Sequence, residues 1–110
     1  MPRYALFFSY TAEAWNRMIQ NPGDRAAAAR AVAESAGGTL ESIYFMFGCH
    51  DGMAICDLPD GEAAAAASIA VNSSGAFRSV ETRELITPER LVAILGRAGE
   101  ASGVYRAPGT

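Results

Sequence analysis

The order in which strand-like and helix-like segments follow one another constrains the fold of this chain most. The segment RYALFFSY (3–10) is short, aromatic and apolar on both sides, which is typical of a buried strand. A short helical pattern follows it, NPGD (21–24) interrupts that pattern, and an alanine-rich helix (25–36) ends at a glycine pair. The same signals predict further strands at 39–47, 53–58 and 76–85, a helix within 59–75, and a last helix that starts at TPER (87–90) and stops at Gly99.

This β-α-β-β-α-β order, followed by a C-terminal helix, predicts an α+β fold of the ferredoxin-like kind. In that fold a four-stranded antiparallel sheet carries its helices on one face. The short connection between 39–47 and 53–58 indicates an antiparallel hairpin. No linker or repeat divides the chain, so we expect a single domain over 1–110, with about 100–110 as a flexible tail.

The first two predicted strands lack the alternation of apolar and polar residues that is typical of a sheet with one solvent-exposed face. Both ALFF (5–8) and IYFMF (43–47) are apolar on both faces. Something other than water should therefore cover the second face. In a chain of 110 residues the simplest cover is the same sheet of a second copy, which predicts a homodimer with sheets packed face to face.

Composition and charge exclude some partners. The formal net charge is −3, and the nine basic residues are all arginines without a basic run, so no nucleic-acid surface is indicated. No segment is long enough for a membrane span, and the N-terminus lacks the features of a signal peptide. We therefore expect a cytoplasmic protein in which Cys49 and Cys56 are free thiols.

The segment FGCHDG (47–52) brings together Cys49, the chain's only histidine and Asp51. Neighbours on an extended segment point to opposite sides, so a catalytic Cys49–His50 pair is disfavoured. Two interpretations remain. One is a turn in which Asp51 caps backbone amides, and the other is a ligand-binding or proton-transfer role for His50. One histidine and two separated cysteines do not form a metal site, so we predict neither a metal nor a cofactor, haem included.

The aromatic residues of the first strands have two interpretations as well. They serve core and dimer packing, or some of them line an apolar pocket between sheet and helices, where tyrosine hydroxyls supply the polar groups. For the second case we name Phe8 and Trp15, with Asp51, as candidate ligand-binding residues.

Several segments carry a resemblance to a known family. They are MPRYALFFSYTAEAW, NPGDR, FGCHDG, PDGEAAAA, TRELITPE and YRAPG. With them the chain resembles the GYD domain family, small bacterial proteins placed among the dimeric α+β barrels. The family's motif has a glycine followed by Tyr-Asp, which match Gly48, His50 and Asp51, so His50 stands where tyrosine is usual. The resemblance implies a ferredoxin-like fold and dimers, and it implies no established reaction.

Three functions remain open at this stage. The first is a homodimeric domain for small-ligand binding or assembly, with a small apolar or aromatic ligand. The second is a cofactor-independent oxygenase or isomerase of the dimeric α+β barrel type, with His50 as base and Tyr10 or Tyr44 positioning the substrate. An enzyme should place His50 and a tyrosine on one cavity wall. The third is an effector-sensing module that acts through a separate partner.

Overall fold

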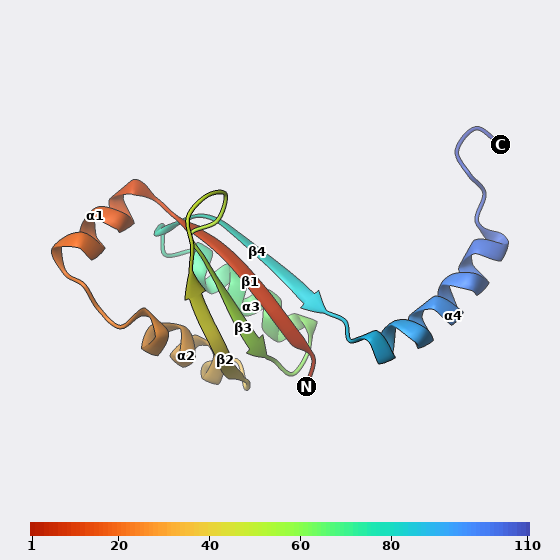
Figure 1. The fold of residues 1–110 in the computed structure, drawn as a ribbon, viewed down its shortest axis with the longest axis horizontal. Coiled ribbons are helices and arrows are strands. Elements are labelled where there is room, and N and C mark those ends of the chain that lie inside the picture. Colours follow the sequence, from red (N-terminus) through yellow and green to blue (C-terminus); the bar gives the residue numbers. More distant parts are fainter.

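The computed structural model describes all residues from 1 to 110. The elements run in the order β1 (Arg3–Tyr10), α1 (Ala12–Gln20), α2 (Arg25–Ser35), β2 (Thr39–Phe45), β3 (Gly52–Asp57), α3 (Gly61–Asn72), β4 (Phe77–Leu85) and α4 (Pro88–Val104) (Figure 1). The four strands form one antiparallel sheet in the order β2-β3-β1-β4. This is the predicted ferredoxin-like α+β fold.

Every helix begins at a residue whose side chain caps it. The side-chain oxygens of Thr11, Asp24, Asp60 and Thr87 each accept a hydrogen bond from the backbone N–H three residues further on. Such a cap satisfies one of the N–H groups that a helix start leaves without a partner. The four starts were therefore readable from the sequence.

Helices α2 and α3 lie against the same face of the sheet but over different strands. Helix α2 packs mainly over β2 at one edge, and α3 packs over β4 at the other (Figure 1). The core between sheet and helices is formed by buried residues of small to aromatic size: Tyr4, Phe8, Tyr10, Ala14, Ala33, Ala54, Cys56, Leu58 and Ala64. The central strands β1 and β3 therefore face a space that neither helix fills completely.

Helices α1 and α4 extend away from this body, towards opposite ends of the molecule (Figure 1). The chain measures 57 × 33 × 23 Å, and its radius of gyration is 17.5 Å, against about 13 Å for a compact domain of this length. No residue of α4 is buried, although Leu91, Ile94 and Leu95 are apolar. The apolar side of α4 is thus without a partner inside the chain.

One expectation about these outer helices was wrong. Helix α4 does not stop at Gly99 but continues to Val104, because a glycine costs a helix only about 1 kcal/mol and does not have to end it. Helix α1 buries Ala14, with Met18 partly buried, and Ile19 is 72% exposed.

Candidate ligand cavity and the Cys-His-Asp turn

The alternation along β1 assigns its side chains to two different environments. Leu6, Phe8 and Tyr10 face the helices, where they line a cavity. Phe7 belongs to the other side, where it contacts His50, and this face carries no helix. The two faces of the sheet therefore hold different candidate residues.

The helix side holds an apolar cavity of about 380 Å³. Of its 19 lining residues, 17 are hydrophobic. They come from all four strands, from α2 and α3, and from the segments next to these elements: Leu6, Phe8, Tyr10, Arg25, Ala28, Ala29, Val32, Ala33, Ile43, Ala54, Cys56, Leu58, Ala67, Ala70, Val71, Ser74, Ala76, Phe77 and Val80. The volume lies within the range of about 300–1,000 Å³ that is typical of small-molecule sites.

The alanines of α2 and α3 explain why the cavity exists. Ala33 and Ala67, with exposed fractions of 3% and 7%, lie close to the sheet. Ala28, Ala29 and Ala70 line the space between the helices with single methyl groups. Larger residues at these positions would fill the middle of the sheet, as cores normally do. The alanine runs predict helices in the sequence, and only the packing of α2 and α3 on the sheet makes them cavity walls.

A second cavity of about 290 Å³ adjoins the first. It is lined by residues at the end of β1, on α1 and at the start of α2: Tyr10, Ala14, Arg17, Met18, Asn21, Arg25 and Ala76. Three of them, Tyr10, Arg25 and Ala76, also line the apolar cavity. The two spaces therefore meet at Tyr10, and the second one adds a polar, arginine-containing end.

Tyr10 is held firmly at this junction. It is 4% exposed, and its ring stacks on Phe77 at 4.9 Å and meets Trp15 edge-on at 5.1 Å, between ring centroids. Its phenolic hydroxyl makes no hydrogen bond within the chain. Of the other residues named from the sequence, Phe8 lines the apolar cavity, and Trp15 supports Tyr10 without lining either cavity.

The Cys-His-Asp segment forms a turn that is tied to the end of β1. The Asp51 carboxylate accepts a hydrogen bond from the Tyr10 backbone N–H at 2.8 Å. The Asp51 N–H in turn donates to the Phe8 carbonyl at 2.9 Å, and the Ser9 hydroxyl donates to the Cys49 carbonyl at 3.1 Å. Asp51 thus caps a backbone amide, as the turn interpretation of this segment predicts.

His50 lies on the other face of the sheet and lines neither cavity. Its ring is 5.2 Å from the ring of Phe7, and its Nε2 is 3.8 Å from a carboxylate oxygen of Glu81. Its Nδ1 is buried without a hydrogen-bond partner. The structure therefore does not bring His50 and Tyr10 to a common wall.

Glu81, the acidic neighbour of His50, was not predicted from the sequence, where Tyr10 or Tyr44 was expected to act together with His50. Tyr44 is 65% exposed. Glu81 lies opposite Phe7 in the β1–β4 ladder, so it reaches the ring that packs on Phe7. The long-range register of two strands decides this contact, and no local pattern in the sequence reports it.

The two cysteines are free, as predicted, and they differ strongly in their surroundings. Cys49 is exposed in the turn, and Cys56 is buried at an exposed fraction of 6% on the helix side of β3. Burial, with a smaller effect of the Asp57 charge, raises the pKa of the Cys56 thiol above its ordinary value. No group of three or more His, Cys, Asp or Glu side chains is placed to hold a metal ion.

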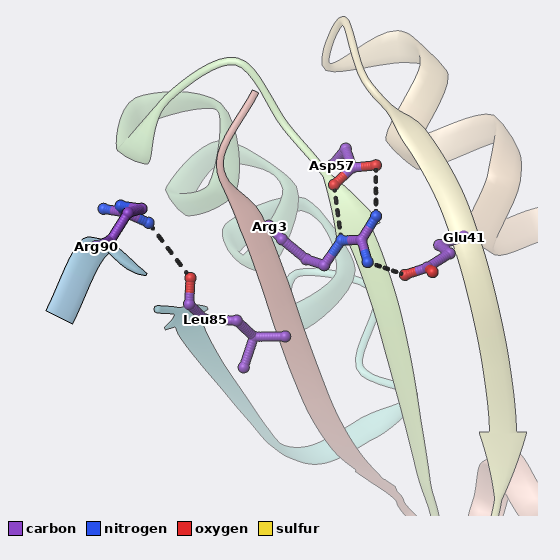
Figure 2. Close-up of polar contacts among 5 residues, drawn as sticks. All are labelled: Arg3, Glu41, Asp57, Leu85 and Arg90. Atoms are coloured by element: carbon purple, nitrogen blue, oxygen red, sulfur yellow. Dashed lines mark hydrogen bonds and ion pairs between the residues drawn. The ribbon is translucent and has the colours of Figure 1, made fainter. Parts of the chain in front are cut away.

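An ionic cluster lies at the far end of the sheet from the Cys-His-Asp turn. Figure 2 shows the Arg3 guanidinium between the carboxylates of Asp57 and Glu41, at 3.0 Å from each. The hydrogen bond from Arg3 holds the pKa of the Asp57 carboxyl below its ordinary value. Arg90, at the start of α4, donates to the Leu85 carbonyl (Figure 2). Its guanidinium also pairs with the Glu84 carboxylate.

The strand order and the one-sided helices define a ferredoxin-like α+β domain, and comparison with known proteins identifies its family. The sequence matches the GYD domain family over residues 4–95, and the chain belongs to this family. A structure described as the crystal structure of FFRP-DM1 is similar to it, with a TM-score of 0.47 and 11% sequence identity, over 78% of this chain and all of that one. No functionally curated protein matches the chain. No helix is long and apolar enough to cross a membrane.

Proposed function

We propose that this GYD domain protein is a homodimeric binding domain that holds a small apolar molecule between its sheet and its helices. The apolar cavity of about 380 Å³ is the observation that supports this function. A cavity of this size lined mainly by hydrophobic groups gains free energy when an apolar ligand replaces water in it. Phe8 from β1 and the alanines of α2 and α3 form its walls.

The homodimer is supported by apolar surface that the single chain leaves uncovered. On the face without helices Phe7, Met53 and Ile55 are only partly buried, and Tyr44 next to them is largely exposed. The exposed apolar residues of α4 form a separate uncovered surface. Soluble monomers rarely keep large contiguous apolar patches, so a second copy is the expected cover.

The enzymatic alternative, with His50 as base, has less support. His50 and Glu81 form a histidine–carboxylate pair on the open face, but the cavities of this chain lie on the helix side. A base must reach the proton that it abstracts in an enclosed substrate site. The arrangement therefore favours binding over catalysis, with Tyr10 and Phe8 as ligand contacts.

A neutral fluorescent probe tests the binding function. N-phenylnaphthylamine should bind the native protein and gain fluorescence as it leaves water. Ala29→Leu and Ala70→Leu each place three additional carbon atoms into the cavity, and each should weaken probe binding by about tenfold or more. The matched control is Ala31→Leu, on the exposed side of α2, which should bind the probe like the native protein.

The result decides the proposal in either direction. If the native protein does not bind the probe, or if Ala31→Leu weakens binding as much as Ala29→Leu, the cavity is not the binding site. Thermal unfolding of all three variants shows that the fold is retained. The dimer is tested by light scattering, where the native protein should have the mass of two chains and Phe7→Arg the mass of one. A native monomer would contradict the homodimer.

A further inference from the structure

We infer that the ligand is an apolar carboxylic acid whose carboxylate is held by Arg17, Arg25 and the Tyr10 hydroxyl. This inference rests on the proposed binding function and adds the chemical class of the ligand. The apolar part occupies the larger cavity, and the carboxylate lies in the adjoining polar one. Hydrogen-bond donors without partners at the junction, the positive charge of the two arginines and the volume of the apolar cavity support this assignment.

The first observation is the free hydroxyl of Tyr10. The residue is 4% exposed and lines both cavities, and its ring is fixed by Phe77 and Trp15. The hydroxyl makes no hydrogen bond within the chain, and its oxygen is not buried, in contrast to the Nδ1 atom of His50. It is therefore open to the cavity and available to donate to a group there.

The second observation is the pair of arginines beside it. Arg17 on α1 and Arg25 at the start of α2 line the same cavity as Tyr10, and neither guanidinium takes part in an ion pair of the chain. Three arginines of the chain, Arg3, Arg83 and Arg90, are paired with carboxylates, and the others are not. Arg17 and Arg25 are distinguished from the other unpaired arginines by their position at the cavity. The nearest acidic residue in sequence, Asp24, uses its carboxylate to accept the Ala27 N–H.

These donors match the geometry of a carboxylate. A guanidinium presents parallel N–H groups that suit two carboxylate oxygens, and such charge-assisted hydrogen bonds are stronger than neutral ones. The junction therefore offers two positive charges and one hydroxyl donor, with the apolar cavity directly behind them. A ligand that uses both parts has an apolar body and an anionic end.

The size of the apolar cavity suits the apolar part of such a ligand. Its volume of about 380 Å³ lies in the range of small-molecule sites and accommodates a chain the length of a medium-chain fatty acid.

The test compares an acid with an alcohol of the same chain. Octanoic acid and octanol should both displace N-phenylnaphthylamine from the native protein at neutral pH, and the acid should do so at least about tenfold more tightly, as expected for charge-assisted hydrogen bonds. In the double variant Arg17→Gln, Arg25→Gln the affinities of acid and alcohol should become equal within about twofold. Tyr10→Phe should lower the affinity for the acid while it leaves that of the alcohol unchanged.

The matched control is Arg30→Gln, an exposed arginine of α2 that lines neither cavity. It should keep the full preference for the acid. All variants should still bind the neutral probe, which shows that the cavity is intact in each. The fluorescence of the single tryptophan, Trp15, whose ring packs on Tyr10, gives a second readout of binding at this end.

Each outcome separates the inference from the function on which it rests. If the probe binds but the native protein does not prefer the acid, the inference is wrong and the binding function stands. If the double variant keeps the preference, other groups hold the carboxylate and the inference is again wrong. If neither the probe nor the acid binds, by fluorescence and by calorimetry, the binding function fails and the inference fails with it.

Discussion

The two faces of β1 each carry a phenylalanine and differ in what covers it. On one face Phe8 and Tyr10 lie under α2 and α3, with exposed fractions of 8% and 4%. On the other face Phe7 is partly buried, against His50, and no helix covers it. An apolar residue in a strand therefore does not say whether its partner comes from the same chain or from another molecule. The predictions below separate the two cases.

The largest expected difference is between Phe8→Ala and Phe7→Ala. Phe8 belongs to the core of the chain itself, and its truncation should lower the free energy of unfolding by about 3–5 kcal/mol. Phe7→Ala should affect mainly the association of two chains. Urea unfolding at two protein concentrations measures both effects.

The concentration dependence provides the control for this comparison. Phe8→Ala should shift the urea midpoint equally at both concentrations, and Phe7→Ala should weaken the dependence of the midpoint on concentration. Equal effects of the two substitutions would mean that the open face is not an interface.

A smaller effect on stability is expected at the Cys-His-Asp turn between β2 and β3. Asp51→Ala removes the acceptor of the Tyr10 N–H and should destabilise the protein by about 1–3 kcal/mol, the cost of a partly buried donor without a partner. Asp51→Asn keeps a side-chain acceptor oxygen and the shape of the side chain, so it should lose less stability than Asp51→Ala. Thermal unfolding of both variants checks this prediction, and a larger loss for the asparagine would contradict the role of Asp51 as a cap.

The ionic cluster on the open side should stabilise the protein at neutral pH and lose this contribution at acidic pH. Arg3 keeps the pKa of Asp57 lower in the folded chain than in the unfolded one, so the folded state favours the ionised carboxylate. This contribution is present at neutral pH and is lost as the pH falls through the lowered pKa, below about pH 4. The free energy of unfolding, measured between neutral and acidic pH, should therefore change less with pH in Asp57→Asn than in the native protein.

The last prediction concerns the reactivity of the two thiols and not the stability of the protein. Cys49 is exposed and Cys56 is buried with a raised thiol pKa, so only one cysteine per chain should react quickly with a thiol reagent at neutral pH. Cys49→Ser should abolish this fast phase, and Cys56→Ser should leave it unchanged. Two fast-reacting thiols would show that the helix side of β3 is open to solvent.

Most of the fold followed from local signals in the sequence. Caps such as Thr11 and Asp60, and the breaks at NPGD and Gly75, placed each strand and helix up to the start of α4 within about three residues. These signals act through a few neighbouring backbone groups, so they can be read without knowledge of the tertiary structure. The end of α4 was the exception, because a glycine weakens a helix without a fixed stopping point.

Less of the candidate site than of the fold could be predicted from the sequence, because the site depends on contacts between segments that are distant in the chain. Phe8 was predicted as a ligand contact and Tyr10 as a residue that positions a substrate, and the structure places both on the wall of the apolar cavity. Arg17 and Arg25 were not named, because only the packing of α1 and α2 brings them to Tyr10. Glu81 escaped notice for the same reason, because a register between β1 and β4 places it beside His50.

The alanine walls of the cavity have a consequence for how this fold can diverge. Ala28, Ala29 and Ala70 present one methyl group each, so substitutions at single positions can reduce the space in steps without moving the backbone. A methylene group contributes about 0.8 kcal/mol to an apolar contact, and one added group therefore changes which molecules are accommodated and how tightly. In the proposed binding function, a few small residues on two helices set the length of the ligand, and the arginines and the tyrosine at the polar end set its charge. Under that proposal the two properties can vary independently in this scaffold.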